Sequence, residues 1–138
     1  MRFVDTNIFI YALLKPKRKL TQAEGQIKEK AKNIFRRIDR GEEVLTSVVH
    51  LSEIANFLEN AVNQTFALEF VRDLMTKPNI TVVDVGRGEY MAALFLAEDK
   101  ASRANDALAY ITMLDRDVKE IYSFDKHLDN FPVVRIID

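Results

Sequence analysis

Short apolar runs alternate with longer amphipathic segments along nearly all of the 138 residues, and this alternation limits the fold more than any other feature. The runs have the composition of strands, and the segments between them carry apolar residues at helical spacing. Strands are predicted at residues 1–5, 44–46, 80–85, 121–123 and 133–137, and helices at residues 6–14, 21–40, 47–60, 63–77, 89–99 and 102–115. Because short strands joined through helices pair in parallel, the sequence predicts a three-layer α/β sandwich with a central, mostly parallel sheet of four to five strands. We expect one domain over residues 1–138.

The composition excludes several classes of protein. With 48% hydrophobic and 30% charged residues the chain is typical of globular proteins, and without cysteine it has neither a disulfide framework nor a thiolate metal site. The longest apolar stretch, Ile8 to Leu14, is too short to span a bilayer. We therefore expect a soluble, cytoplasmic protein with no membrane segment.

The net charge of −1 hides an uneven distribution. Residues 15–40, which we call the basic arm, hold ten basic and three acidic residues, so their balance is +7 and the rest of the chain carries −8. Such a molecule could bind a polyanion with the arm and cations with the remainder. The alternative is a solvated helix face, and the sequence leaves both open.

The first acid of interest, Asp5, lies between two apolar runs. Burying an unpaired charge there would cost several kcal/mol, on the order given for an ion taken out of water. Asp5 either caps the helix that begins near Thr6 or lies at the carboxyl edge of a parallel strand, where open α/β sheets bind ligands.

Further acids occur at strand ends and helix starts. Glu53 has Val49 and Phe57 one helical turn away, so it borders the core, and Asp106 lies in a first turn that Ser102 is predicted to cap. Three to five clustered carboxylates, without cysteine or a histidine pair, select Mg²⁺ or Mn²⁺ and suit phosphoryl hydrolysis. The other candidates of this set are Asp125, directly after a strand, and Asp129, four residues later. Of the two histidines, His50 is predicted on a helix surface and His127 as a phosphate contact in the site loop.

Four segments carry a resemblance to a known family: residues 3–7 (FVDTN), 52–54 (SEI), 105–108 (NDAL) and 123–125 (SFD). In this order they resemble the acidic motifs of PIN-domain ribonucleases, most closely the small VapC-type toxins. The resemblance implies a PIN fold, Mg²⁺- or Mn²⁺-dependent endonucleolytic hydrolysis of RNA, a VapB-type antitoxin partner and a homodimer. By position, the resemblance implies metal-binding and catalytic roles for Asp5, Glu53, Asp106 and Asp125. It implies a further metal ligand in Asp129. The polar residues that it places beside them are Thr6, Asn7, Asn105 and Ser123.

The basic arm then becomes a candidate for RNA delivery, because an acidic site repels phosphate and needs positive charge nearby. Candidate backbone contacts in the arm are Lys32, Arg36 and Arg37, and those outside it are Arg103 and Lys126.

Three other functions remain open at this stage. The first is a PIN nuclease that processes RNA without an antitoxin, and the second is a non-catalytic PIN-like module that binds RNA or protein. The third is a receiver domain, which is disfavoured because Asp5 has no adjacent acid and Asp84 is followed by Val85 and Gly86.

Overall fold

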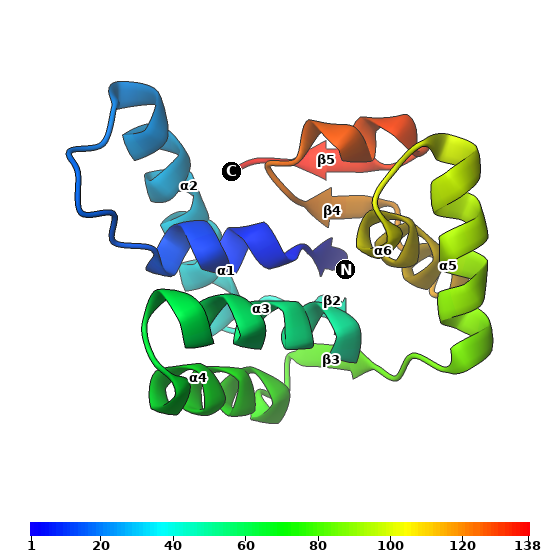
Figure 1. Cartoon of the computed structure of the whole chain (residues 1–138), viewed down its shortest axis with the longest axis horizontal. Coiled ribbons are helices and arrows are strands. Elements are labelled where there is room, and N and C mark those ends of the chain that lie inside the picture. The colour runs from blue at the N-terminus through cyan, green and yellow to red at the C-terminus, as the bar shows by residue number, and fades with distance from the viewer.

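The computed structural model describes residues 1–138 and contains a five-stranded sheet in the order β3-β2-β1-β4-β5, with helices on both faces (Figure 1). The strands are β1 Arg2–Val4, β2 Val44–Ser47, β3 Ile80–Val83, β4 Glu120–Tyr122 and β5 Val134–Ile136. The helices are α1 Thr6–Leu13, α2 Gln22–Asp39, α3 Val48–Ala61, α4 Gln64–Thr76, α5 Arg87–Lys100 and α6 Ala104–Asp115, with a 3-10 helix η1 at Lys126–Asn130. All neighbouring strands pair in parallel, which confirms the predicted fold class. None of the helices has the length and apolar character that a membrane span requires.

The sheet is buried on both faces. Successive strand residues point to opposite sides, so Val4 enters a core covered by α1, α2, α3 and α4, while Phe3 enters a second core beneath α5, α6 and η1. In β2, Val44 likewise enters the first core and Leu45 the second. This double burial explains why the strands read as short continuous apolar runs.

Most helix starts follow the sequence signals, but α5 begins at Arg87, two residues before its predicted start, and the predicted cap of α6 is wrong. Thr21 and Glu24 form the predicted capping box of α2, and the Ser47 hydroxyl accepts from the backbone of α3. The prediction that Ser102 caps α6 is wrong, because Arg103 occupies the N-cap position and makes no side-chain capping bond. The Ser102 hydroxyl instead donates to the carbonyl of Arg103 at 3.3 Å.

The loop after β4 separates the carboxylates of Asp125 and Asp129. Asp125 and Asp129 would share a face only on an α-helix, but the segment forms the 3-10 helix η1, with about three residues per turn. Asp129 accepts from the Arg135 guanidinium of β5, with an Nε to Oδ1 distance of 3.1 Å. The two carboxylates are therefore directed to different partners.

Candidate functional site

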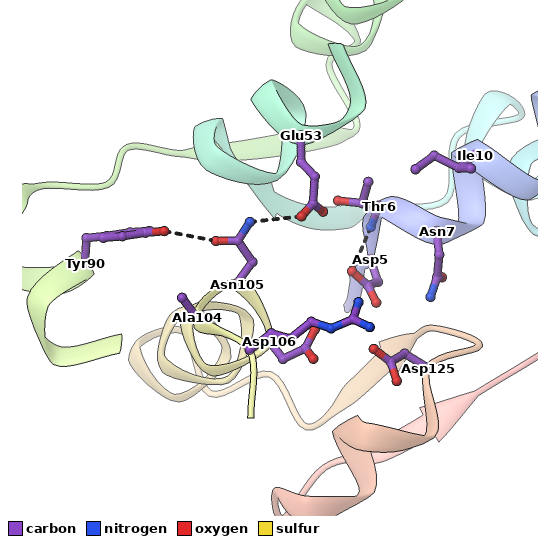
Figure 2. A pocket seen from close by; sticks show the side chains of 11 residues that line it. Asp5, Thr6, Asn7, Ile10, Glu53, Tyr90, Ala104, Asn105, Asp106 and Asp125 are labelled. Carbon is purple, nitrogen blue, oxygen red and sulfur yellow. Dashed lines mark hydrogen bonds between the residues drawn. The ribbon is translucent and has the colours of Figure 1, made fainter. Parts of the chain in front are cut away.

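A cavity of about 440 Å³ opens at the carboxyl edge of the sheet, where the strand order reverses between β1 and β4. Four predicted acids line it, each from a different segment: Asp5, Glu53, Asp106 and Asp125. Figure 2 shows their side chains directed into the same space. The predicted polar neighbours Thr6, Asn7 and Asn105 also line the cavity, together with Arg103.

Asp5 combines both interpretations that the sequence left open. Its Oδ1 accepts from the backbone N–H of Thr6 at 2.8 Å and so caps α1, while its Oδ2 accepts from the Ser123 hydroxyl at 2.6 Å. The side chain is buried, and burial raises the pKa of Asp5 to about 6, assisted by the charges of Glu53 and Asp125 and opposed by the two hydrogen bonds. Asp5 is thus a helix cap that also faces the cavity.

Asp106 has the least favourable surroundings of the four acids. Its carboxyl is buried, and Oδ2 has no hydrogen-bond partner. Burial raises the pKa of Asp106 to about 7, and repulsion from Asp5, Asp125 and Glu53 adds to the effect, while Arg103 opposes it. An unpartnered carboxylate oxygen directed among other carboxylates is the arrangement that a bound cation would relieve.

Glu53 is held by a side chain from α6. The Asn105 amide donates to Glu53 Oε2 at 3.0 Å, and the Tyr90 hydroxyl donates to the Asn105 amide oxygen at 3.4 Å (Figure 2). Tyr90, which was not among the predicted site residues, also lines the cavity, from α5. No local pattern marks it, because its position depends on how α5 packs beside α6.

The Ser123 hydroxyl joins β4 to the start of α1. Besides donating to Asp5, it accepts from the backbone N–H of Asp125 at 3.0 Å and from the Asn7 amide at 3.3 Å. The Asn7 amide oxygen in turn accepts from the N–H of Phe124 at 3.3 Å. The predicted supporting residues therefore fix the loop that carries Asp125.

The two histidines lie in different environments. His127 is exposed, and its Nδ1 and backbone N–H both contact Asp125 Oδ1, at 2.8 and 2.9 Å. The prediction that His50 lies on a helix surface is wrong, because its ring is buried between the Ser47 hydroxyl and the Asn105 carbonyl. Its spacing of three and four residues from Glu53 and Ile54 places it on the inner face of α3 and was the available signal.

The structure does not bring the candidate residues of the basic arm to the cavity, since none of Lys32, Arg36 and Arg37 lines it. The last turn of α2 precedes β2, so it lies at the amino edge of the sheet, opposite the acids. There the Arg37 guanidinium stacks on the Tyr122 ring at 5.5 Å. Two candidates remain beside the site: Arg103 lines the cavity, and Lys126 is exposed next to Asp125.

Carboxylates are suitable ligands for a hard divalent cation, although no three of these acids lie close enough together to form a preformed metal site. All four offer carboxylate oxygens, and burial together with the neighbouring carboxylates raises the pKa of Asp5 and of Asp106, so a cation in the cavity would favour their ionised forms. Asp129 does not line the cavity and is paired with Arg135.

Comparisons with known proteins agree with this geometry. The family model of the PIN domain matches residues 2–134, and no curated protein sequence matches the chain. Among solved structures, VapC20 of Mycobacterium tuberculosis, a toxin that cleaves the sarcin-ricin loop, is similar with a TM-score of 0.77 and 18% identity over 100% of both chains. A toxin–antitoxin complex from Klebsiella pneumoniae is similar with a TM-score of 0.65 and 12% identity, over 97% of this chain and 95% of that chain. VapBC2 of Rickettsia felis, solved with a DNA fragment from its promoter, is similar with a TM-score of 0.63 and 13% identity, over 98% of this chain and 96% of that chain.

Proposed function

Because this chain belongs to the PIN-domain family, as its acidic motifs predicted, we propose that it is a metal-dependent endoribonuclease that hydrolyses RNA phosphodiester bonds as the toxin of a VapBC-type pair. The family is one of nucleases, and RNA is the substrate that the likeness to the sarcin-ricin-loop toxin favours. We propose that the whole chain acts as one domain, in the cytoplasm.

One observation carries the proposal: four carboxylates line a single cavity, and one of them has a buried oxygen without a partner. Without a cation this arrangement is unfavourable, since like charges and burial both oppose ionisation. Such a cluster is therefore expected where a cation is held for chemistry.

The residues divide into distinct roles. The ligands of Mg²⁺ or Mn²⁺ would be drawn from Asp5, Glu53, Asp106 and Asp125, and the bound ion would supply an activated water and neutralise charge on the scissile phosphate. Ser123 and Asn105 orient the carboxylates of Asp5 and Glu53 through their hydrogen bonds. Arg103, the basic residue in the lining, would contact an RNA phosphate.

Cleavage of RNA by the purified protein tests the enzymatic proposal. Activity should disappear in EDTA and return with Mg²⁺ or Mn²⁺, and Glu53→Gln should abolish it while leaving the circular dichroism spectrum unchanged. Glu59→Gln is the matched control, because Glu59 lies on the same helix α3, exposed and outside the cavity lining. Full activity of Glu53→Gln in Mg²⁺ would refute the assignment.

The antitoxin partner is a separate part of the proposal, supported by the toxin–antitoxin complex among the similar structures. An antitoxin segment that placed a basic side chain among the four acids would inhibit the enzyme in place of a metal ion. Co-expression with the small protein encoded beside its gene should yield a complex without nuclease activity. A stable complex that cleaves RNA as fast as the free protein would contradict this.

A homodimer is the last part, and the exposed face of α5 supports it. Met91, Leu94 and Phe95 follow one another at spacings of three and one along this face and are 43%, 44% and 67% exposed. Apolar side chains gathered in this way are common at subunit interfaces. We expect sedimentation to show a dimer at micromolar concentration and Phe95→Glu to dissociate it, whereas a monomeric wild-type protein would refute the dimer.

A further inference from the structure

His50 connects segments that carry three of the four acids, through its ring and through its backbone carbonyl. Its ring lies between the Ser47 hydroxyl at the start of α3 and the backbone carbonyl of Asn105 in the first turn of α6. We infer that His50 is a positioning residue, which holds the first turn of α6, and with it Asp106, against the helix that carries Glu53. The inference rests on the proposed metal-dependent function and concerns how this chain keeps its ligands in place.

The hydrogen bonds of the ring fix which nitrogen carries the proton. A backbone carbonyl can only accept, so the contact of 3.0 Å between Nε2 and the Asn105 oxygen requires a proton on Nε2. In the neutral ring Nδ1 then accepts from the Ser47 hydroxyl at 2.6 Å. The same hydroxyl oxygen accepts from the backbone N–H of His50 at 3.2 Å, so every polar atom of this group has a partner. The brace between α3 and α6 is therefore a directed N–H···O bond.

Two more contacts anchor His50 to the centre of the sheet. The Thr6 hydroxyl, next to Asp5, donates to the His50 carbonyl at 3.3 Å. The Phe3 ring of β1 packs against the imidazole, with centroids 5.0 Å apart and planes at 76°. Because β1 is the middle strand, His50 joins α6 to the most enclosed part of the fold.

The first turn of α6 needs such a brace. The helix starts without a side-chain cap, and the Asp106 carboxyl has an oxygen without a partner. The charges of Asp5 and Asp125 repel Asp106, so electrostatics push the start of α6 away from the other ligands. The bonds that oppose this displacement come through Asn105, whose side chain donates to Glu53 and whose carbonyl accepts from His50.

His50 is not proposed as a metal ligand or a base, since both ring nitrogens are engaged and the side chain is only 1% exposed. It acts on the metal site through the backbone of Asn105. Outer groups that orient metal ligands change metal affinity by about 10-fold to 100-fold when they are removed.

Mn²⁺ binding to the full-length protein, measured by titration calorimetry without RNA, tests the inference. His50→Leu removes the N–H donor, whereas His50→Gln keeps an amide donor near the position of Nε2. We expect the Kd for Mn²⁺ to rise about 10-fold in His50→Leu and to return to within about threefold of wild type in His50→Gln. The matched control is Thr112→Val. Thr112 is buried in α6, the helix that His50 braces, and its hydroxyl donates to the Leu108 carbonyl of that helix. This variant should lower the Tm without changing the Kd.

The outcomes separate the inference from the function on which it rests. If wild-type protein fails to bind Mn²⁺, the proposed metal-dependent function falls. If wild type binds and His50→Leu binds equally well, or His50→Gln is as weak as His50→Leu, the positioning role is refuted. Should His50→Leu not fold, nitrogen-15 NMR of labelled histidine in the wild-type protein decides, because a proton on Nδ1 of His50 would overturn the directed bond.

Discussion

Asp106→Asn should make the metal-free protein more stable, although it removes a residue of the site. In the folded protein burial and neighbouring carboxylates raise the pKa of Asp106 from 3.8 to about 7. The folded state therefore holds this proton more tightly than the unfolded chain does. By linkage the free energy of unfolding falls as the pH rises from about 4 to about 7, and the penalty is complete above that range.

The pKa values set the magnitude. A shift of about three units corresponds to about 4 kcal/mol of lost stability at pH 8.5, while at pH 5 the same two pKa values give about 2 kcal/mol. Asparagine carries no charge, but its amide group is buried where Oδ2 of Asp106 had no partner. Leaving a buried polar group without a hydrogen bond costs about 2 kcal/mol. We expect Asp106→Asn to gain about 2 kcal/mol at pH 8.5 and almost nothing at pH 5.

Urea unfolding followed by circular dichroism in EDTA, at pH 5 and pH 8.5, measures both values. Asp73→Asn on the exposed face of α4 is the control and should change the free energy of unfolding by less than about 0.5 kcal/mol at either pH. A loss of stability in Asp106→Asn at pH 8.5, or a gain that does not depend on pH, would show that the carboxyl is not held in repulsive surroundings.

Three further predictions concern the side chains of Ser123, Arg103 and Arg37. Ser123→Ala removes the hydroxyl that lowers the pKa of Asp5, so the acid limb of Mn²⁺ binding should move to higher pH in a titration, and an unmoved limb would contradict the 2.6 Å contact. Arg103→Ala should weaken RNA binding severalfold and reduce its salt dependence in filter binding, because Arg103 lines the cavity. Arg37→Ala should leave RNA binding unchanged and lower the free energy of unfolding by about 1 kcal/mol, because Arg37 stacks on Tyr122. Weaker RNA binding by Arg37→Ala would restore the basic arm as the RNA contact.

The fold could be predicted because its signals are local and agree with one another. Each strand is a short apolar run bounded by turn or cap residues, and the helices α2, α3 and α4 each show an apolar stripe. The capping box at Thr21 and Glu24 located the start of α2 correctly. The acids of the cavity could be predicted for a related reason, since Asp5 directly follows β1, Asp125 lies three residues beyond the end of β4, and the carboxyl ends of these two strands meet at one edge.

The partners of these acids depend on packing between helices, which local patterns do not contain. The basic arm looked close to Asp5 in sequence, but α2 runs along the sheet and ends at its amino edge, where Arg37 meets Tyr122. The partner of His50 could not be predicted for a similar reason, because its acceptor, the Asn105 carbonyl, lies 55 positions further along the chain. Backbone carbonyls leave no sequence signal.

The repulsion within the cavity leads to a prediction that links stability to metal. A cation that binds only the folded state adds RT ln(1 + [L]/Kd), about 2.7 kcal/mol at 100 times the Kd. Wild-type protein should gain this amount from Mn²⁺ at pH 8.5, while Asp106→Asn, with one ligand fewer and a Kd about 100-fold higher, should gain only about 0.4 kcal/mol at the same Mn²⁺ concentration. Since Asp106→Asn starts only about 2 kcal/mol ahead in EDTA, the order of the two stabilities should reverse when Mn²⁺ is added. Urea unfolding at the two metal conditions tests this, with Asp73→Asn expected to follow wild type. Equal gains from Mn²⁺ in Asp106→Asn and wild type would mean that Asp106 does not hold the ion, and the repulsion around it would then need another explanation.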